Sequence, residues 1–277
     1  RDRVHSVWAM WHQMQEGDFV QTYTEKGFRG SDKEWESMCI PFDEDAKICL
    51  NGVIDRVDLC SLPGEELIKI IDYKSSDSQD LSLAKVYYGL QMQLLTYLEA
   101  AKEMVEKEHK GKEAVPAAML YYAIKEKNLD WKPESEEEYE KRVLDSMKCK
   151  GYVNEEPEII GHLDKSIVNG GELIPGQKSV VVPVAVDKKG LLKKNSETLS
   201  TKDFETLIAH TKEKMKECGK AILDGKIEAI PYVYEDNDGC TYCPYGSVCG
   251  HESKKDGVRE MKKMSDDEVW EALYGDD

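Results

Sequence analysis

Two aspartates and a lysine occupy neighbouring predicted strands in the stretch GVIDRVDLCSLPGEELIKIIDYKSS. Asp55 lies on the first strand, and the second strand carries Asp72, Tyr73 and Lys74. Adjacent strands are about 4.8 Å apart, so carboxylates on one face of a hairpin can share a divalent cation. Asp72 and Lys74 are two residues apart and therefore lie on the same face. We expect two acids and one amine to converge on one point.

Such a group of side chains could support phosphodiester hydrolysis. Carboxylate oxygens suit Mg²⁺ or Mn²⁺, and such a cation polarises a phosphoryl oxygen and makes bound water a better nucleophile. Lys74 could orient that water or stabilise charge that develops on the phosphate. The alternative is a surface hairpin with Asp and Lys on its wet face. The apolar residues before each acid favour the metal site, because a carboxylate in an apolar strand is costly unless it is paired or metal-bound.

The chain has 277 residues, of which 40% are hydrophobic and 34% are charged. This composition excludes a membrane span, a disordered tail and a collagen-like fibre, and it predicts one domain over residues 1–277. The net charge of −17 predicts a surface that repels polyanions. If nucleic acid is the substrate, another component must deliver it. Because the chain opens with Arg1 inside a helical pattern, we expect it to be a piece of a longer protein.

Hydrophobic periodicity predicts both helices and strands around these residues. Helices are expected at 1–15, 83–110, 134–147, 201–224 and 265–277. Strands are expected at 38–42, 47–59, 66–76, 116–124 and 178–190. The first three strands should form one meander, and residues 150–175 show no clear periodicity. Two of the helices open with capping boxes, from Ser135 to Glu138 and from Ser265 to Glu268.

The most basic segment, KKGLLKKNSETLSTK, follows the last of these strands. Its lysines are Lys188, Lys189, Lys193, Lys194 and Lys202. Two interpretations stay open at this level: an exposed hairpin tip, or a loop that contacts phosphate.

The two acidic strands and the helix after them resemble the PD-(D/E)xK nuclease superfamily, in its RecB-like branch. The resemblance rests on G-x-I-D-R-V-D, on I-I-D-Y-K-S-S and on Y-Y-G-L-x-x-Q-L-L-T-Y. In the last of these, Gln93 and Tyr97 match the Q-x-x-x-Y motif of that branch. Four residues apart, they share one helical face, from which they can reach the active-site strands or a DNA phosphate. Without the preceding motifs they would be read as a polar pair in a mostly core stripe.

The resemblance implies a role for each residue of the group. Asp55 and Asp72 would ligate the metal, the backbone carbonyl of Tyr73 would join them, and Lys74 would be catalytic. Asp58 is a second candidate acid of lower rank, because its side chain should lie on the opposite strand face from Asp55. RecB-like nucleases also carry an upstream motif histidine. Neither His5 nor His12 stands in that context, so we expect this ligand to lie outside the chain.

Three cysteines near the C-terminus, Cys240, Cys243 and Cys249, have C-x₂-C-x₅-C spacing, which predicts metal ligation. Zinc and an iron-sulfur cluster both accept such thiolates. The surrounding I-P-Y and C-T-Y-C-P-Y-x-S-V-C resemble the iron-sulfur motif of the AddB family of ATP-dependent helicase/deoxyribonuclease subunits. The resemblance implies a 4Fe-4S cluster on a motif at 231–252, with its fourth cysteine in a more distant part of a longer protein. The other five cysteines are interpreted as ordinary thiols.

Taken over nearly the whole chain, the resemblance implies an α/β fold: a mixed central sheet flanked by helices, with a C-terminal cysteine motif. It also implies a Mg²⁺-dependent DNA exonuclease domain of a helicase-nuclease complex that processes double-strand breaks for recombinational repair. An AddA-like helicase subunit would form the heterodimer and deliver single-stranded DNA. We expect a cytoplasmic protein without membrane contact, since the cysteines of a Lys- and Glu-rich chain without a signal segment favour a reducing compartment. The alternative is a non-catalytic module that docks a partner or grips DNA.

Overall fold

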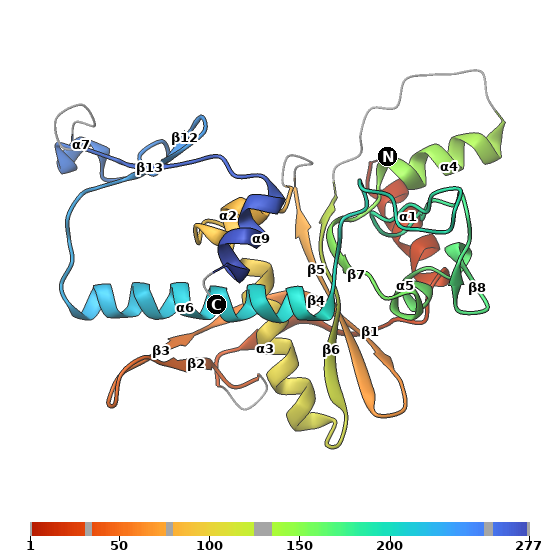
Figure 1. Ribbon diagram of the computed structural model, residues 1–277, viewed down its shortest axis with the longest axis horizontal. Helices are drawn as coiled ribbons and strands as arrows, with labels where there is room; N and C mark the ends of the chain where they lie inside the picture. The colour runs from red at the N-terminus through yellow and green to blue at the C-terminus, as the bar shows by residue number, and fades with distance from the viewer. Residues whose placement is uncertain (1, 31–34, 76–79, 125–134, 252–256, 276–277) are drawn as a thin grey trace. The chain divides into compact units, whose positions relative to one another are not determined.

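The computed structural model describes residues 2–30, 35–75, 80–124, 135–251 and 257–275 (Figure 1). These residues group into two compact units. The first unit comprises Arg1–Met38, Cys49–Leu81 and Met92–Ile208, and the second comprises Cys39–Ile48, Ser82–Gln91 and Ala209–Asp277. The sequence-based division into one domain with a cysteine motif at 231–252 stays a prediction, and residue 252 lies outside the described residues.

A mixed sheet forms the centre of the first unit. In the described part of the chain it has six strands in the order β1-β4-β5-β6-β7-β10. β5 pairs with β6 and β7 with β10 in parallel, while the other neighbours are antiparallel. The strands are β1 (Val20–Phe28), β4 (Gly52–Ser61), β5 (Glu65–Lys74), β6 (Glu113–Ala123), β7 (Lys150–Asn154) and β10 (Thr198–Leu199). The mixed sheet confirms the predicted α/β class.

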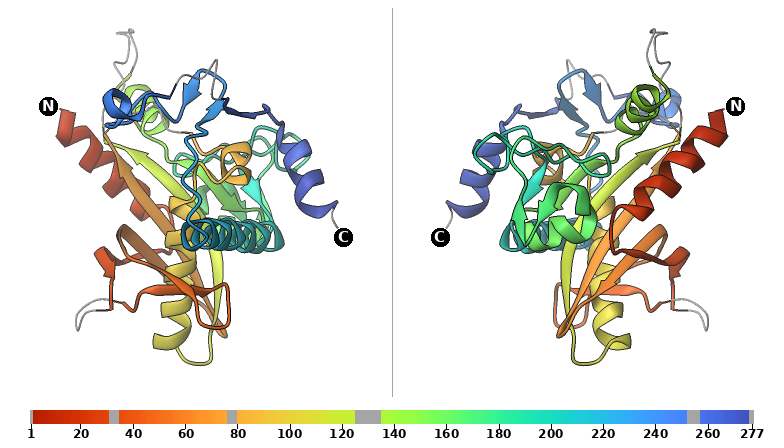
Figure 2. Two further views of the ribbon diagram at one scale, coloured as in Figure 1. Left: turned by 90° about the vertical axis from the view of Figure 1, so that its left-hand side faces the viewer. Right: turned by 90° about the vertical axis from the view of Figure 1, so that its right-hand side faces the viewer.

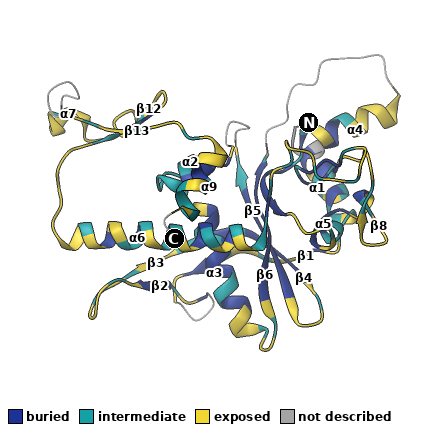
Figure 3. Ribbon diagram, viewed as in Figure 1, coloured by how far each residue is buried: buried dark blue, intermediate teal, exposed yellow. Residues whose placement is uncertain are grey.

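Helices cover both faces of this sheet. α3 (Gln93–Glu108) packs on β5 and β6 and buries Leu94, Leu98 and Val105 there. α1 (Asp2–Gln15) runs alongside the strands on the other face, where the hydroxyl of Tyr122 donates to the carbonyl oxygen of Ser6 at 3.1 Å (Figure 2). The first unit also contains α4 (Glu136–Ser146), α5 (Pro157–Leu163), η1 (Lys165–Ile167), β8 (Val168–Asn169) and β9 (Glu172–Leu173). β5 and β6 are buried along nearly their whole length, as expected for strands covered on both faces (Figure 3).

The second unit consists of short elements. β11 (Tyr232–Tyr234) lies between β12 (Asn237–Asp238) and β13 (Arg259–Met261), and two short helices are α2 (Leu83–Tyr87) and α7 (Gly246–Cys249). α6 (Thr201–Leu223) begins in the first unit and ends in the second. α9 (Asp266–Tyr274) contacts α2. The capping boxes predicted for α4 and α9 are both present, which confirms where these helices begin.

The single helix predicted over 83–110 is wrong. The structure has α2 and α3 instead, and residues 88–92 between them are not helical. Gly89 adopts a left-handed φ of 75°, a conformation that glycine reaches without the steric penalty of a side chain. The apolar stripe continues through the break, which is why periodicity alone did not reveal it. As a result Gln93 stands at the start of a new helix.

The strand predictions also need correction. β1 was missed because this edge strand exposes most of its residues and lacks apolar alternation. β7 was missed because it is short and opens with Lys150 and Gly151. No regular strand forms over 178–190, where the described backbone makes only isolated bridges and Pro183 removes a donor. β2 (Met38–Pro41) and β3 (Lys47–Leu50) pair with each other in a separate sheet, so the predicted meander of three strands is wrong. Its last step is confirmed, because β4 and β5 form an antiparallel pair.

The cysteines of β2 and β3 were also misread. Cys39 and Cys49 are disulfide-bonded, whereas the sequence pattern had suggested ordinary thiols. Cys60 and Cys149 are free and buried and Cys218 is free and exposed, in agreement with the interpretation as thiols.

Substituting Gly151 by alanine is expected to destabilise the sheet. Gly151 has a φ of 126°, and a Cβ there would lie 3.2 Å from the Cα of Leu120 and still closer to the carbonyl oxygen of Met119. The strained backbone and the clash should lower the free energy of unfolding by about 1–3 kcal/mol. Urea unfolding of Gly151→Ala measures this. Gly176→Ala is a control, because glycine there has φ 80° but open space around the added atom.

Candidate active site

The two predicted metal-binding carboxylates come together on β4 and β5. The register pairs Arg56 with Ile71, and continuing it by one residue places Asp55 opposite Asp72. The backbone N–H of Tyr73 donates to Oδ2 of Asp55 at 2.8 Å, which fixes the Asp55 side chain at this end of the pair. The Asp72 side chain is only 4% exposed. The structure therefore brings both acids to one site, as the sequence predicted.

Lys74 connects the acids to α3. Its Nζ lies 2.5 Å from Oδ2 of Asp72 and donates to Oε1 of Gln93 at 3.2 Å. Nε2 of Gln93 in turn donates to the hydroxyl oxygen of Tyr97 at 3.0 Å. Gln93 and Tyr97 thus act as one hydrogen-bonded pair that faces the strands. The polar-pair alternative, in which both belong to a core stripe, does not account for the contact with Lys74.

Sequence reasoning missed Tyr121. This residue of β6 is the register partner of Asp72 on β5, so both side chains share one face of the sheet. Nζ of Lys74 lies 5.2 Å from the centroid of the Tyr121 ring. Burial, then the charge of Asp72 and the nearby Tyr97, raise the pKa of Tyr121 to about 12, so it stays a neutral phenol at neutral pH. Its position follows only from the pairing of β5 with β6, which local sequence patterns do not report.

The electrostatics of Asp72 suit a cation. Burial raises the pKa of this carboxyl, Lys74 partly offsets the rise, and the charge of Asp55 adds to it. A divalent cation between two such carboxylates would neutralise charge that a single lysine does not. Among the residues that the structure describes, no three His, Cys, Asp or Glu side chains are arranged to hold a metal ion. The site therefore offers two carboxylates, and the carbonyl of Tyr73 stays a predicted third ligand.

Replacing Asp72 by asparagine is expected to raise the melting temperature of the metal-free protein at neutral pH. A raised carboxyl pKa means that the folded state binds this proton more tightly than the unfolded chain. Protonated Asp72 therefore contributes to the stability of the fold. This contribution is complete below the ordinary pKa of 3.8 and is lost as pH rises through the pKa of the folded state, so the ionised carboxylate destabilises the fold at neutral pH. The advantage of Asp72→Asn should shrink as pH falls. Thermal unfolding with chelator tests this, and a lower melting temperature for the variant at neutral pH would contradict it.

Asp58 is not part of this site. It lies on the opposite face of β4 from Asp55, as the sequence predicted, and it is fully buried. Its carboxylate forms ion pairs with Nε of Arg56 at 2.6 Å and with Nζ of Lys69 at 2.9 Å. Although burial raises its pKa, Lys69 and Arg56 outweigh that effect and hold the pKa of Asp58 below its usual range. Asp58 therefore joins two buried cations within the core.

A comparison with known families agrees with this geometry. The pattern of the PD-(D/E)XK nuclease superfamily matches residues 1–250. The chain belongs to the PD-(D/E)XK nuclease superfamily. The family match covers the acidic strands, α3 and the cysteines, so the family prediction made from the motifs is confirmed.

Curated relatives in this superfamily share a name, that of the AddB subunit of the ATP-dependent helicase/deoxyribonuclease. The chain is 34% identical over 269 residues to this subunit from Lachnoclostridium phytofermentans, which covers 96% of the chain and 22% of that protein. It is 32% identical over 272 residues to the subunit from Thermoanaerobacter sp. strain X514, covering 97% of the chain and 23% of that protein. The subunit from Clostridium botulinum is 34% identical over 275 residues, with coverages of 97% and 23%. The chain thus spans less than a quarter of the length of these relatives.

The three predicted cluster cysteines lie close in sequence and are exposed in the second unit. The backbone N–H of Cys243 donates to the carbonyl oxygen of Cys240 at 3.0 Å, a turn of the kind that C-x-x-C pairs use. Local desolvation and then the charges of Asp238, Cys243 and Cys249 raise the pKa of the Cys240 thiol. Metal ligation by these cysteines stays a prediction.

In the described part of the chain, no helix has both the length and the apolar content to cross a membrane.

Proposed function

We propose that this PD-(D/E)XK nuclease domain is a metal-dependent deoxyribonuclease that hydrolyses phosphodiester bonds. The observation that supports this most is the convergence of two carboxylates and one ammonium group at one point. Asp55 and Asp72 come from adjacent strands, and Lys74 is held between Asp72 and Gln93. A domain that served only as a scaffold would have no chemical need for all three.

Each side chain has a distinct task in this mechanism. Asp55 and Asp72 would hold Mg²⁺ or Mn²⁺ together with the carbonyl oxygen of Tyr73, and the ion would supply Lewis acid polarisation of the phosphoryl group. The ammonium of Lys74, whose side chain is 21% exposed, can stabilise negative charge on the phosphate or orient the attacking water. Gln93 fixes the position of that ammonium through its Oε1.

Two aromatic residues complete the surroundings of the lysine. The hydroxyl of Tyr97 accepts from Gln93, which limits the amide to one orientation. The ring of Tyr121, on the neighbouring strand β6, lies beside the ammonium of Lys74. We infer that Gln93 and Tyr97 position the lysine and that Tyr121 shields it from solvent. Such preorganisation is what makes a charged group effective in a transition state.

We further infer that the substrate is single-stranded DNA and that the domain works as an exonuclease within a helicase-nuclease complex. The relatives named as helicase/deoxyribonuclease subunits support this inference. The net charge of −17 agrees with it, because an acidic domain gains from a partner that delivers the strand. An AddA-like helicase subunit is the proposed partner, and processing of double-strand breaks for recombinational repair is the proposed setting.

Cleavage of end-labelled single-stranded DNA tests the function. The chain is incubated with Mg²⁺, with Mn²⁺ or with a chelator, and products are resolved by length. We expect products that shorten progressively from one end with either metal and none with chelator. Absence of cleavage by the folded chain with metal would favour the second candidate, a non-catalytic module that binds DNA or docks a partner. The acidic surface supports the docking role of that candidate, because it opposes unaided binding of a polyanion.

We propose that Cys240, Cys243 and Cys249 supply three thiolates to a 4Fe-4S cluster in a longer protein. Their C-x₂-C-x₅-C spacing and the turn that joins Cys240 to Cys243 support this proposal. The measurement is iron and acid-labile sulfide content of a longer protein that includes these residues, beside its Cys243→Ser variant. Iron should be present in the first and strongly reduced in the second. Zinc in place of iron, or equal iron in both proteins, would count against the cluster.

A further inference from the structure

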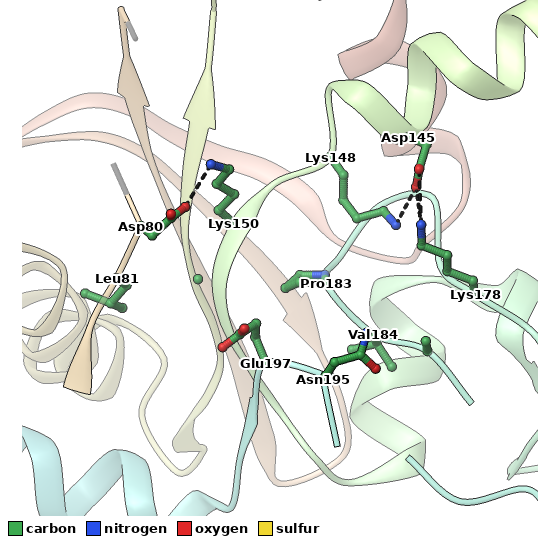
Figure 4. Close-up of a pocket in the computed structure, with 12 residues that line it drawn as sticks. Asp80, Leu81, Asp145, Lys148, Lys150, Lys178, Pro183, Val184, Asn195 and Glu197 are labelled. Atoms are coloured by element: carbon green, nitrogen blue, oxygen red, sulfur yellow. Dashed lines mark hydrogen bonds and ion pairs between the residues drawn. The ribbon is translucent and has the colours of Figure 1, made fainter. Parts of the chain in front are cut away.

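A cavity of the first unit lies apart from the carboxylates, at the start of β7. It has a volume of about 360 Å³, which falls within the range of ligand-binding pockets. It is lined in part by Lys148 from the loop between α4 and β7, by Lys150 from β7 and by Lys178 from the segment between β9 and β10 (Figure 4). The proposed hydrolysis uses none of these lysines.

The cavity is next to the active site along the sheet. Asp72 on β5 pairs with Tyr121 on β6, and Tyr121 pairs with Lys150 on β7. Paired residues of neighbouring strands share a face, so Asp72, Tyr121 and Lys150 form one row. Two steps of about 4.8 Å separate the ends of this row, or roughly 10 Å. A polyanion that has one charged group bound at Asp72 can therefore place another charged group at Lys150.

The charges of the cavity are arranged in two groups. Asp145 receives Nζ of Lys148 at 2.9 Å and Nζ of Lys178 at 2.8 Å, which leaves this group with one net positive charge. On the other side of the cavity, Nζ of Lys150 lies 2.8 Å from Asp80, and Glu197 adds a third carboxylate to the lining (Figure 4). The three lysines and three carboxylates balance over the whole cavity, so the positive charge is local to the group around Asp145. The Lys148 side chain is 11% exposed, whereas Lys178 is 60% exposed. A partly desolvated cation beside an accessible one is a combination that suits an entering anion.

We propose that this cavity, here called the lysine pocket, binds a backbone phosphate of the DNA strand next to the phosphate being cleaved. The proposal rests on the proposed function, since it places a second phosphate of the same strand. Lys148 and Lys178, whose ammonium groups share the carboxylate of Asp145, bind the phosphate in competition with that carboxylate. In an acidic chain, such a local cationic group supplies the contact that the rest of the surface does not. The loop that carries Lys178 leads to the basic segment with Lys188. A phosphate bound by Lys178 would favour the interpretation of that segment as a loop that contacts phosphate.

The test is binding of a fluorescent oligothymidylate, followed by anisotropy in chelator so that no cleavage occurs. Affinity is measured over about 50–200 mM salt for the parent, Lys148→Gln and Lys178→Gln. Each lysine that neutralises a phosphate on a single strand contributes about 0.7 to the slope of log affinity against log salt. We therefore expect each variant to bind more weakly and to lose about 0.7 from the slope. Asp145→Asn should change affinity in the opposite direction, because it removes the competing carboxylate.

Controls separate this proposal from loss of fold and from the proposed function. Lys107 pairs with Glu36 at 2.7 Å near the far end of α3, so Lys107→Gln should leave both affinity and slope unchanged. Weaker binding by Asp145→Asn as well would indicate a structural role and overturn the proposal. Equal slopes for parent and both lysine variants, or no oligonucleotide binding by the parent, would also overturn it. If the parent cleaves DNA with Mg²⁺ while the slopes stay equal, the nuclease function stands and only the lysine pocket fails.

Discussion

Lys74→Ala is expected to lower the rate of DNA cleavage by at least ~10²-fold, the scale of removing one preorganised contact to a transition state. The ammonium of Lys74 contacts Asp72 and Gln93, and neither contact can be replaced by a methyl group. The fold should persist, because the lysine lies at the end of β5 and its side chain reaches solvent. Single-turnover cleavage with saturating Mg²⁺ measures the loss.

A matched control distinguishes chemistry from a general loss of positive charge. Lys107→Ala removes an exposed lysine that also pairs with a carboxylate, and it should cleave at the parental rate. Lys74→Arg keeps the charge but changes its shape and reach, so it should recover only part of the activity. Parental cleavage by Lys74→Ala would show that this lysine is not catalytic and would remove the main support for the proposed mechanism.

Asp58→Asn is expected to lower the free energy of unfolding by about 3–5 kcal/mol, the range for breaking a buried ion pair by removing one partner. The change would leave Arg56 and Lys69 buried without their counter-charge. Because the pKa of Asp58 is held low, this stabilisation is present above its ordinary pKa and is lost as pH falls through the folded pKa. Urea unfolding near neutral pH should therefore show a large difference in the free energy of unfolding between the parent and Asp58→Asn. This difference should become smaller at acidic pH.

An exposed ion pair provides the comparison. Lys214 and Glu217 lie one turn apart on α6 at 3.0 Å, and both side chains reach solvent. Glu217→Gln should change the free energy of unfolding by less than about 1 kcal/mol. A similarly small change for Asp58→Asn would mean that the buried group is not what holds β4 and β5 together at this point.

The local parts of the site followed from the sequence because they depend on short-range spacing. Asp72 and Lys74 share a face through the two-residue period of a strand, and Gln93 and Tyr97 share one through the four-residue spacing of a helix. The hairpin that brings Asp55 to Asp72 is joined by a turn in which Gly64 has a φ of 85°. These features need no knowledge of the rest of the chain.

The parts that were missed depend on pairing between distant segments. Tyr121 reaches Asp72 only because β5 and β6 are parallel neighbours, and no local pattern reports that pairing. β1 escaped notice because an exposed edge strand has no apolar period, and the residues around Pro183 were misread because they are buried without forming a strand. The break at Gly89 was hidden by an apolar stripe that continues through it. Burial and strand order, rather than composition, decide these cases.

The net charge of the chain, like its composition, does not describe the charge at one site. A net charge of −17 argued against unaided binding of nucleic acid. The structure nevertheless gathers Lys148 and Lys178 around one carboxylate, in a cavity that Lys150 of the active-site row also lines. Net charge describes the average surface, whereas binding depends on the potential at one place. An acidic protein can therefore present a cationic contact where a strand has to pass.

Asp55 and Asp72 are proposed to hold one divalent cation together. Calorimetric titration of Mn²⁺ into the chain, beside Asp72→Asn and the exposed-carboxylate control Glu217→Gln, tests this most directly. We expect binding to the parent and to Glu217→Gln, and at least a ~10-fold loss of affinity for Asp72→Asn, as removal of a ligand should cost no less than removal of a supporting contact. Equal Mn²⁺ affinity of the parent and Asp72→Asn would contradict the claim.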